Sequence, residues 1–354
     1  MSDINEMLID STKKIMRDFS TKETIVETEN GIWPKDLWQI IEESGLTTVA
    51  ISEENGGTGG TFGDAISMLR VIGKFAAPIP LPETLLANWL LADIGLRASI
   101  KPLTLSSIDE KDNFTFTEVE GGWSLTGASN YIPWARFVEG IVIIGTSEKE
   151  TLITVVDPAL CQIKPGTNLG GESRDFVEIQ DQFIKKVEVI AVTEAVLMSN
   201  YYKGTIIKTA LMAGSLERLL ELTAAYTKER SQFGRPIHRF QAIQNHLAVL
   251  SGEATAAKIA ADNLIEAVDT NSYETQAMIT KIVVGEAASK SVPIAHQVLG
   301  AIGFTDEHVL QFTTRRLWAW RDEYGTESEW AEQLGAQVIN NGPEEFWPFI
   351  TALD

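Results

Sequence analysis

Cysteine is almost absent from this sequence, which has Cys161 alone among 354 residues. One thiol cannot form an internal disulfide, and it excludes a zinc site built from several cysteines. A chain of this length can bury a large apolar core without cross-links. We therefore expect a fold stabilised by packing, in a reducing compartment.

Basic residues are scarce, with 29 Lys and Arg against 49 Asp and Glu and a formal net charge of -20. Proteins that bind nucleic acids or anionic membranes need a basic surface. The charge balance argues against both kinds of partner. It still permits an anionic cofactor, because a few local Arg or Lys residues can hold one.

Long hydrophobic runs are also missing. No stretch approaches the roughly 20 apolar residues of a membrane span, and the polar residues Met1 to Glu6 lack the basic and apolar regions of a signal peptide. We expect a cytoplasmic protein.

Familiar catalytic motifs are absent too. The sequence has no phosphate-binding G-x-x-x-x-G-K-[ST], no H-E-x-x-H and no G-x-S-x-G. The glycines at 56–60 lack the third glycine of a dinucleotide fingerprint and lie between expected helices, so we interpret them as a turn. The histidines lack ligand spacing, and surface or hydrogen-bonded roles are expected for His238, His246, His296 and His308.

The hydrophobic pattern divides the chain into three zones. Residues 1–100 and 193–354 have helical spacing, with Leu216, Leu219 and Thr223 on one predicted face. Residues 101–192 contain short β-branched runs separated by Gly and Pro, typical of antiparallel strands. Strands confined to the middle indicate an α+β fold. We predict domains at 1–100, 101–192 and 193–354.

The strongest local signal runs from Tyr226 to Ala248. A helix is expected to end at Gly234 and a second to start near Arg239. A guanidinium such as that of Arg230 can fork onto a phosphate, and a nearby Phe can cover a flat ring. The alternative is an ordinary helical elbow with a surface arginine, since one arginine seldom makes a site.

This stretch resembles the signature of the acyl-CoA dehydrogenases. Three further segments resemble that family in the same order: 37–57, Gly122–Gly127 and Gln297–Phe304. The resemblance implies an N-terminal helical domain, a middle antiparallel β-barrel or sandwich domain and a C-terminal four-helix bundle.

The resemblance also implies a reaction. In this family an acyl-CoA thioester is oxidised between Cα and Cβ, a glutamate removes the α-proton and the β-hydride passes to FAD. Electrons then leave to an electron-transfer flavoprotein or a similar acceptor. The implied partners are therefore an acyl-CoA substrate, FAD, that acceptor and a second subunit.

The family's FAD site is shared between subunits. The positions that reach across a dimer interface are matched here by Arg230, Gln232, Phe233, Gln241, Gln297 and Gly300. The resemblance gives Arg230 and Gln297 the diphosphate side, and Phe233 and Gln241 the adenosine side. Ala301 departs from the pattern, because it replaces a second glycine.

The segments that contact the flavin ring in the family are altered. The usual T-E-P loop corresponds to a shortened stretch at 101–107. In the usual W-[IV]-T-N segment, Pro133 replaces a threonine, so neither a hydroxyl nor an N–H remains there.

The catalytic base is displaced as well. An ungapped count from Gly300 places Tyr324 at the family's usual glutamate, and Glu323, our candidate base, is one residue away. The family's alternative location holds Gly204 and Thr205. A simpler interpretation makes Asp322 and Glu323 a solvated acidic pair near three arginines.

The chain keeps the residues that reach across the dimer interface, but its flavin-ring contacts are altered. This combination resembles the shorter, base-less subunits of heteromeric acyl-CoA dehydrogenases, such as those acting on steroid side chains. Residues 315–323 also resemble that subgroup. Two alternatives stay open. One is a self-sufficient homo-oligomeric dehydrogenase with Glu323 as base, and the other is a non-catalytic interaction protein that kept the fold.

Overall fold

A computed structural model describes the chain except residues 1–2, 108–112, 269–272, 345 and 352–354. The chain divides into two compact units. The helical unit comprises Met1–Arg17, Phe62–Ala77 and Thr205–Asp354, and the sheet unit comprises Asp18–Thr61 and Pro78–Gly204. Each unit is described by itself.

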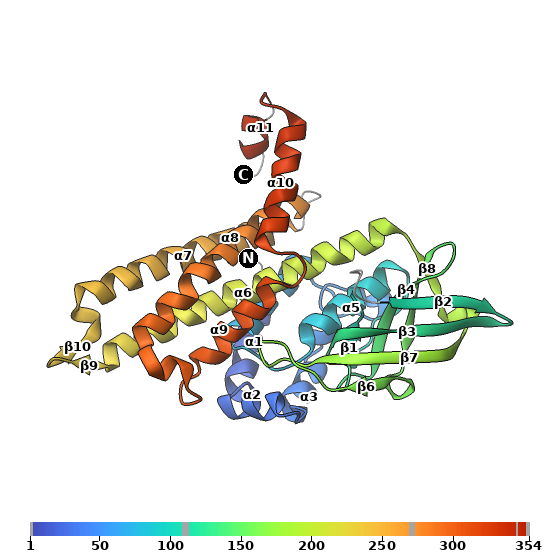
Figure 1. The fold of residues 1–354 in the computed structure, drawn as a ribbon, viewed down its shortest axis with the longest axis horizontal. Helices are drawn as coiled ribbons and strands as arrows, with labels where there is room; N and C mark the ends of the chain where they lie inside the picture. The colour runs from blue at the N-terminus through green and yellow to red at the C-terminus, as the bar shows by residue number, and fades with distance from the viewer. Residues whose placement is uncertain (1–2, 108–112, 269–272, 345, 352–354) are drawn as a thin grey trace. The chain divides into compact units, whose positions relative to one another are not determined.

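The helical unit consists of long helices with short connections, drawn in Figure 1. Its helices are α1 (Asp3–Phe19), α4 (Phe62–Lys74), α6 (Glu194–Glu229, which enters this unit at Thr205), α7 (Gln241–Ala267), α8 (Tyr273–Leu299), α9 (Leu310–Arg321), α10 (Glu327–Asn341) and α11 (Phe346–Thr351). The connections include β9 (Ser231–Gln232), β10 (Arg235–Pro236), the 3-10 turn η5 (Ile237–Arg239) and the 3-10 turn η6 (Gly300–Phe304).

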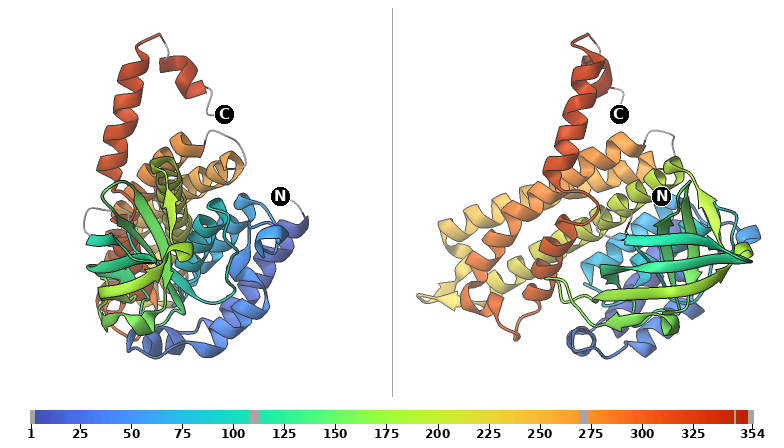
Figure 2. Two further views of the ribbon diagram at one scale, coloured as in Figure 1. Left: turned by 90° about the vertical axis from the view of Figure 1, so that its right-hand side faces the viewer. Right: turned by 45° about the vertical axis from the view of Figure 1, so that its right-hand side comes forward.

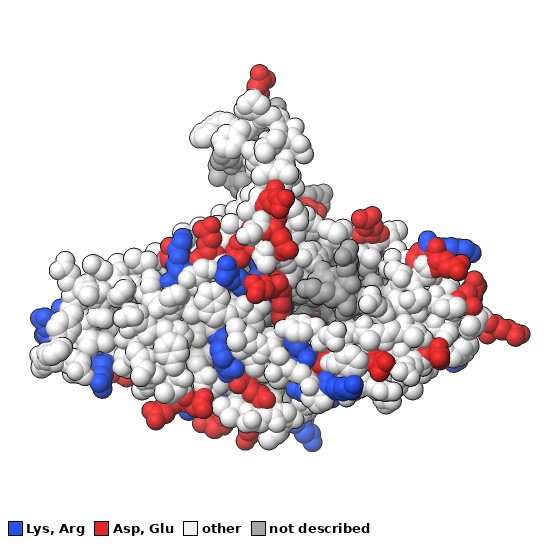
Figure 3. All heavy atoms as spheres, in the orientation of Figure 1, with Lys and Arg blue, Asp and Glu red and all other residues white. Residues whose placement is uncertain are grey.

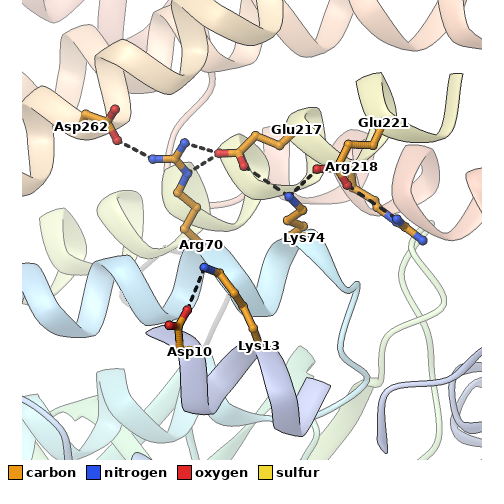
Figure 4. Close-up of polar contacts among 8 residues, drawn as sticks. All are labelled: Asp10, Lys13, Arg70, Lys74, Glu217, Arg218, Glu221 and Asp262. Carbon is orange, nitrogen blue, oxygen red and sulfur yellow. Dashed lines mark hydrogen bonds and ion pairs between the residues drawn. The ribbon is translucent and has the colours of Figure 1, made fainter. Parts of the chain in front are cut away.

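Two glycines allow α4 and α6 to cross at backbone distance. A Cβ added to Gly73 would lie 2.1 Å from the Leu211 carbonyl oxygen, and one added to Gly214 would lie 1.9 Å from the Arg70 carbonyl oxygen. The Ser215 hydroxyl donates to the Gly73 carbonyl at 2.8 Å. Figure 4 shows the ion pairs beside this crossing, where Arg70 joins α4 to Glu217 on α6 and to Asp262 on α7.

The sheet unit combines short helices with one sheet, whose strands are green in Figure 2. Its helices are α2 (Lys22–Glu29), α3 (Lys35–Glu43) and α5 (Leu81–Asp93). Its strands are β1 (Leu103–Leu105), β2 (Asn113–Val119), β3 (Gly122–Pro133), β4 (Gly140–Thr146), β5 (Thr151–Val156), β6 (Gln162–Lys164), β7 (Arg174–Lys185) and β8 (Ile190–Val192).

The strand order is β6-β7-β3-β2-β4-β5-β8, with β1 beside β4. Most pairs are antiparallel, as the sequence predicts, but β4 pairs in parallel with both β1 and β2. The sheet is therefore mixed at its centre. Alternating side chains of β2, β3 and β7 fill the core beneath it, including Phe114, Phe116, Leu125 and Ile179.

The predicted α+β class and element types are confirmed, and two details differ. The helix before the signature turn ends at Glu229, and Gly234 lies in the turn between β9 and β10. The next long helix begins at Gln241, after the 3-10 turn at Ile237–Arg239. The three domain boundaries proposed from the sequence stay a prediction. Among the described residues, no helix combines the length and apolar character needed to cross a bilayer.

Candidate functional site

The residues that match the family's FAD positions gather at one end of the helical unit. Arg230 follows α6, Gln232 and Phe233 belong to the β9–β10 hairpin, and Gln241 starts α7. Gln297 and Gly300 lie at the end of α8, which reaches the same end of the bundle in Figures 1 and 2. The Tyr226 and His308 rings make an edge contact with centroids 6.2 Å apart, which joins the end of α6 to the segment after η6.

The hairpin holds an aromatic ring in solvent. Phe233 and Gly234 form its two-residue loop with φ values of 51° and 78°, as such tight hairpins require. A phenylalanine rarely adopts this backbone conformation, and its side chain is 93% exposed. Its described ring contact is an edge contact with Phe240, 6.2 Å between centroids. Such strain and exposure are typical of a residue that meets a ligand or another chain.

Basic side chains surround this hairpin. Arg230, Arg235 and Arg239 are exposed, and the Arg235 guanidinium lies 4.3 Å from the Phe240 ring centroid. Within the described parts of the chain, no carboxylate forms an ion pair with these three guanidiniums, although the protein is strongly acidic. Figure 3 shows Lys or Arg side chains at this end of the helical unit.

The backbone at Gly300, just after α8, is open to solvent. Gly300 has φ 66°, and a Cβ there would meet no atom within 4 Å. The side chain of Gln297 is exposed one turn before it. Exposed guanidiniums, exposed amides and an exposed ring suit the diphosphate and adenosine parts of a dinucleotide. The residues present here therefore fit that half of FAD.

Glu323 lies elsewhere in the helical unit, just beyond α9. Its Oε2 is 2.9 Å from Nζ of Lys208 on α6, and the lysine side chain is almost entirely buried. Lys281 on α8 is wholly buried and donates from Nζ to the carbonyls of Trp320 at 3.0 Å and Glu323 at 2.8 Å. Glu323 is thus part of a buried charge network.

Burial lowers the pKa of Lys281 to about 8, because an ammonium loses its hydration inside the protein. The nearby carboxylates of Glu323 and Glu327 oppose that shift in pKa, and the ammonium of Lys208 adds to it. Sequence reasoning overlooked both lysines. The sequence did contain a signal for a buried lysine. Lys281 lies on the same helix face as the apolar residues Met278 and Val284, which are buried.

The turn after Glu323 is bonded to Thr205 on α6. Tyr324 has φ 56° and Gly325 has φ 86°, which reverse the chain after α9. The Tyr324 carbonyl accepts hydrogen bonds from Thr205 Oγ1 and from Trp330 Nε1, both at 3.0 Å. The resemblance predicts the family's glutamate at Tyr324 or at Gly204–Thr205. These assignments stay predictions, and none of these residues is a carboxylate.

In the sheet unit, the two segments that the resemblance matches to the family's flavin-ring contacts belong to the sheet or adjoin it. Leu103–Leu105 forms β1, and the Thr104 and Ser106 side chains are fully buried. Ser106 Oγ accepts a hydrogen bond from the Ile144 amide at 2.9 Å. Pro133 ends β3 opposite Arg174. The Thr104 and Ser106 hydroxyls therefore lie in the interior of the sheet unit.

Comparison with known proteins identifies the family. Models of the acyl-CoA dehydrogenase N-terminal and C-terminal domains match residues 2–98 and 195–328, together more than half of the chain. The chain belongs to the acyl-CoA dehydrogenase family. FAD is the cofactor of these enzymes, and the exposed cluster at the hairpin fits its nucleotide half.

Individual relatives agree with this assignment. The acyl-CoA dehydrogenase IpdE2 of Mycolicibacterium smegmatis is 27% identical over 343 residues, covering 96% of this chain and 100% of IpdE2. The fold is similar to that in the ChsE4-ChsE5 complex of Mycobacterium tuberculosis, with TM-score 0.86, 18% identity and coverage of 97% and 99%. It is also similar to a variant of the Tcur3481-Tcur3483 steroid ACAD, with TM-score 0.83, 21% identity and coverage of 96% and 98%.

The roles of individual residues in this acyl-CoA dehydrogenase chain stay predictions. The residues expected at the nucleotide belong to elements at one end of the helical unit (Arg230, Gln232, Phe233, Gln241, Gln297 and Gly300). It places Glu323 in the separate network of Lys208 and Lys281.

Proposed function

We propose that this chain is the non-base-carrying subunit of a heteromeric acyl-CoA dehydrogenase, and that its hairpin end completes the FAD site of a homologous partner. One observation carries the proposal. The residues that match the family's FAD positions are exposed, and no described carboxylate forms an ion pair with the Arg230 guanidinium. The candidate base Glu323, in contrast, is already paired with a buried lysine.

The exposed residues have clear roles in such a complex. The Arg230 guanidinium would donate two hydrogen bonds to phosphate oxygens, and the Gln297 amide would donate another. Phe233 would pack on the adenosine side, covering a surface that water occupies in the free chain. When bound, FAD accepts the hydride that leaves Cβ of the acyl-CoA.

The Lys208 ion pair supports a structural role for Glu323. A carboxylate that abstracts a proton has to face the substrate with a free lone pair. Here the buried ammonium of Lys208 holds that carboxylate, and parting them would leave an uncompensated buried charge. In the proposed complex the base therefore comes from the partner.

Two of the structural relatives support a heteromer. ChsE4-ChsE5 and Tcur3481-Tcur3483 each pair two different chains, and the second is named as a steroid ACAD. By this similarity we propose a bulky, ring-bearing acyl-CoA as the substrate class. An electron-transfer flavoprotein or similar acceptor would take the electrons.

Co-expression tests the proposal. The chain is produced alone and with a homologous dehydrogenase subunit, and flavin absorbance and acyl-CoA oxidation are measured for both. We expect FAD and turnover only in the complex. Arg230→Ala should release FAD from an assembled complex, and Arg218→Ala, within α6, should not. Tight FAD and dehydrogenation by the chain alone would refute the proposal, and a colourless complex would favour the non-catalytic alternative.

A further inference from the structure

His296 directly precedes Gln297 on α8, and its ring is built into the turn that follows. The ring stacks on Phe304 with centroids 4.1 Å apart and an interplanar angle of 25°. Phe304 is the last residue of η6 and is 70% exposed. Its described ring contact is the stack on His296. A stacked pair of this geometry stabilises the conformation that brings both rings together.

The same ring also joins η6 to α9. His296 Nε2 lies 3.0 Å from Oγ1 of Thr314, a buried residue of α9. Thr314 Oγ1 is 3.3 Å from the Gln311 carbonyl, to which it donates. The hydroxyl therefore accepts from His296, which requires a proton on Nε2.

The other ring nitrogen faces the turn. Nδ1 is buried and has no hydrogen-bond partner among the described residues. A Cβ added to Gly303 would stand 3.3 Å from it, so the backbone of η6 packs directly on the ring. Burial lowers the pKa of His296, which favours the neutral ring that this packing needs.

We propose that His296 is a positioning residue that holds the Gly300–Phe304 turn against α8 and α9, and so sets the backbone at Gly300 beside the Gln297 amide for the diphosphate of a partner's FAD. This rests on the proposed function. Without the ring, the turn loses its stacking partner, its link to Thr314 and the surface under Gly303. Gln297 and Gly300 would then have to be ordered by the ligand, which costs affinity.

The experiment compares three variants of the full chain. His296→Val removes the ring, and His296→Phe keeps a ring on Phe304 but loses the bond to Thr314. Ser291→Ala changes another buried polar residue of the same helix and serves as the control. Amide hydrogen exchange of residues 300–305 is measured on the isolated chain. FAD dissociation is measured on the complex with the homologous subunit, together with the melting temperature.

We expect faster exchange at 300–305 in His296→Val, and FAD affinity reduced by about tenfold, as loss of a stacked aromatic pair predicts. His296→Phe should stay within about threefold of wild type, because the stack is the larger contribution. Ser291→Ala should change neither readout.

Unchanged exchange in His296→Val would overturn the proposal, as would faster exchange with FAD affinity equal to wild type. Equal losses in the Phe and Val variants would overturn the role of the stack. A wild-type complex that binds no FAD would refute the proposed function and this inference together. A wild-type complex that binds FAD while His296→Val matches it would refute only the role of His296.

Discussion

Lys208 Nζ and Glu323 Oε2 are 2.9 Å apart, and the lysine side chain is 3% exposed. Lys208 comes from the middle of α6 and Glu323 follows the last turn of α9, so the pair fastens two helices of the bundle. Removing one partner of such a pair leaves the other charge buried and uncompensated. Substitution of Glu323 therefore tests two things: its contribution to the stability of the fold, and whether this chain carries the catalytic base.

Glu323→Gln should destabilise the protein without removing activity. We expect a loss of about 2–4 kcal/mol in the free energy of unfolding, slightly below a fully buried pair because Glu323 is 17% exposed. Turnover of the complex should stay within about twofold of wild type, as expected for a residue outside the chemical step. Urea unfolding and acyl-CoA oxidation by the FAD-loaded complex measure the two effects.

The neighbouring exposed carboxylate provides the control. Asp322→Asn removes the same charge at a solvated position, and it should change the free energy of unfolding by less than about 0.5 kcal/mol. Abolished turnover in Glu323→Gln with FAD still bound would make Glu323 the base and favour the self-sufficient enzyme.

Lys281 predicts a pH dependence of stability. Its pKa is about 8 in the fold, against an ordinary 10.5. Between these values the unfolded chain binds a proton that the folded chain does not, so stability rises as the pH increases from 8 to 10.5. The penalty is fully present below pH 8 and amounts to at most about 3 kcal/mol, at 1.36 kcal/mol per pKa unit.

Lys281→Met isolates this contribution. The variant loses the donor to the Trp320 and Glu323 carbonyls, so it should be less stable than wild type at pH 9–10. The stability of wild type relative to the variant should grow across that pH range, as measured by urea unfolding at several pH values. A difference that is independent of pH would show that Lys281 is ionised equally in both states.

Much of the fold was predictable because the periodic pattern and the turn residues agree. Leu216, Leu219 and Thr223 form one predicted face of α6, and all are fully buried. On α7 the same reasoning succeeded only in part, since Leu250 is buried whereas Ile243 and Leu247 are half-buried. Periodicity finds an apolar helix face, but it does not tell whether that face packs inside the chain or against another chain.

The surroundings of Glu323 could not be predicted from spacing. Its direction depends on the left-handed conformation of Tyr324 and on two lysines that lie 115 and 42 residues away along the chain. The role of the residues that match the FAD positions stays a prediction, but their closeness is partly readable from the sequence, because most of them lie in one continuous segment from Arg230 to Gln241. Only Gln297 and Gly300 had to be brought there by the packing of α8.

The Arg70 network should contribute far more to stability than a surface pair. Arg70 is 14% exposed and pairs with Glu217 and Asp262, whereas Lys13 and Asp10, also drawn in Figure 4, form an exposed pair at 3.2 Å. We expect Arg70→Ala to lose about 2–3 kcal/mol and Lys13→Ala less than about 0.5 kcal/mol. A double-mutant cycle of Arg70→Ala with Asp262→Ala measures the coupling, and a coupling near zero would contradict the prediction.

The crossing of α4 and α6 predicts opposite effects for two glycine substitutions. Gly214→Ala places a Cβ 1.9 Å from the Arg70 carbonyl oxygen, so the helices have to separate. Gly252→Ala, on the exposed side of α7, meets no atom within 4 Å. Because overpacking is costly, Gly214→Ala should lose roughly 1–3 kcal/mol of unfolding free energy. Gly252→Ala should gain about 0.5–1 kcal/mol, because alanine loses less backbone freedom in a helix.

Thermal and urea unfolding of both variants measure these changes. The two substitutions add the same methyl group to a helical glycine, so helix propensity alone would stabilise both proteins equally. A difference in sign therefore reports the contact between α4 and α6. If Gly214→Ala were as stable as Gly252→Ala, the backbones of α4 and α6 would have to lie farther apart than the structure places them.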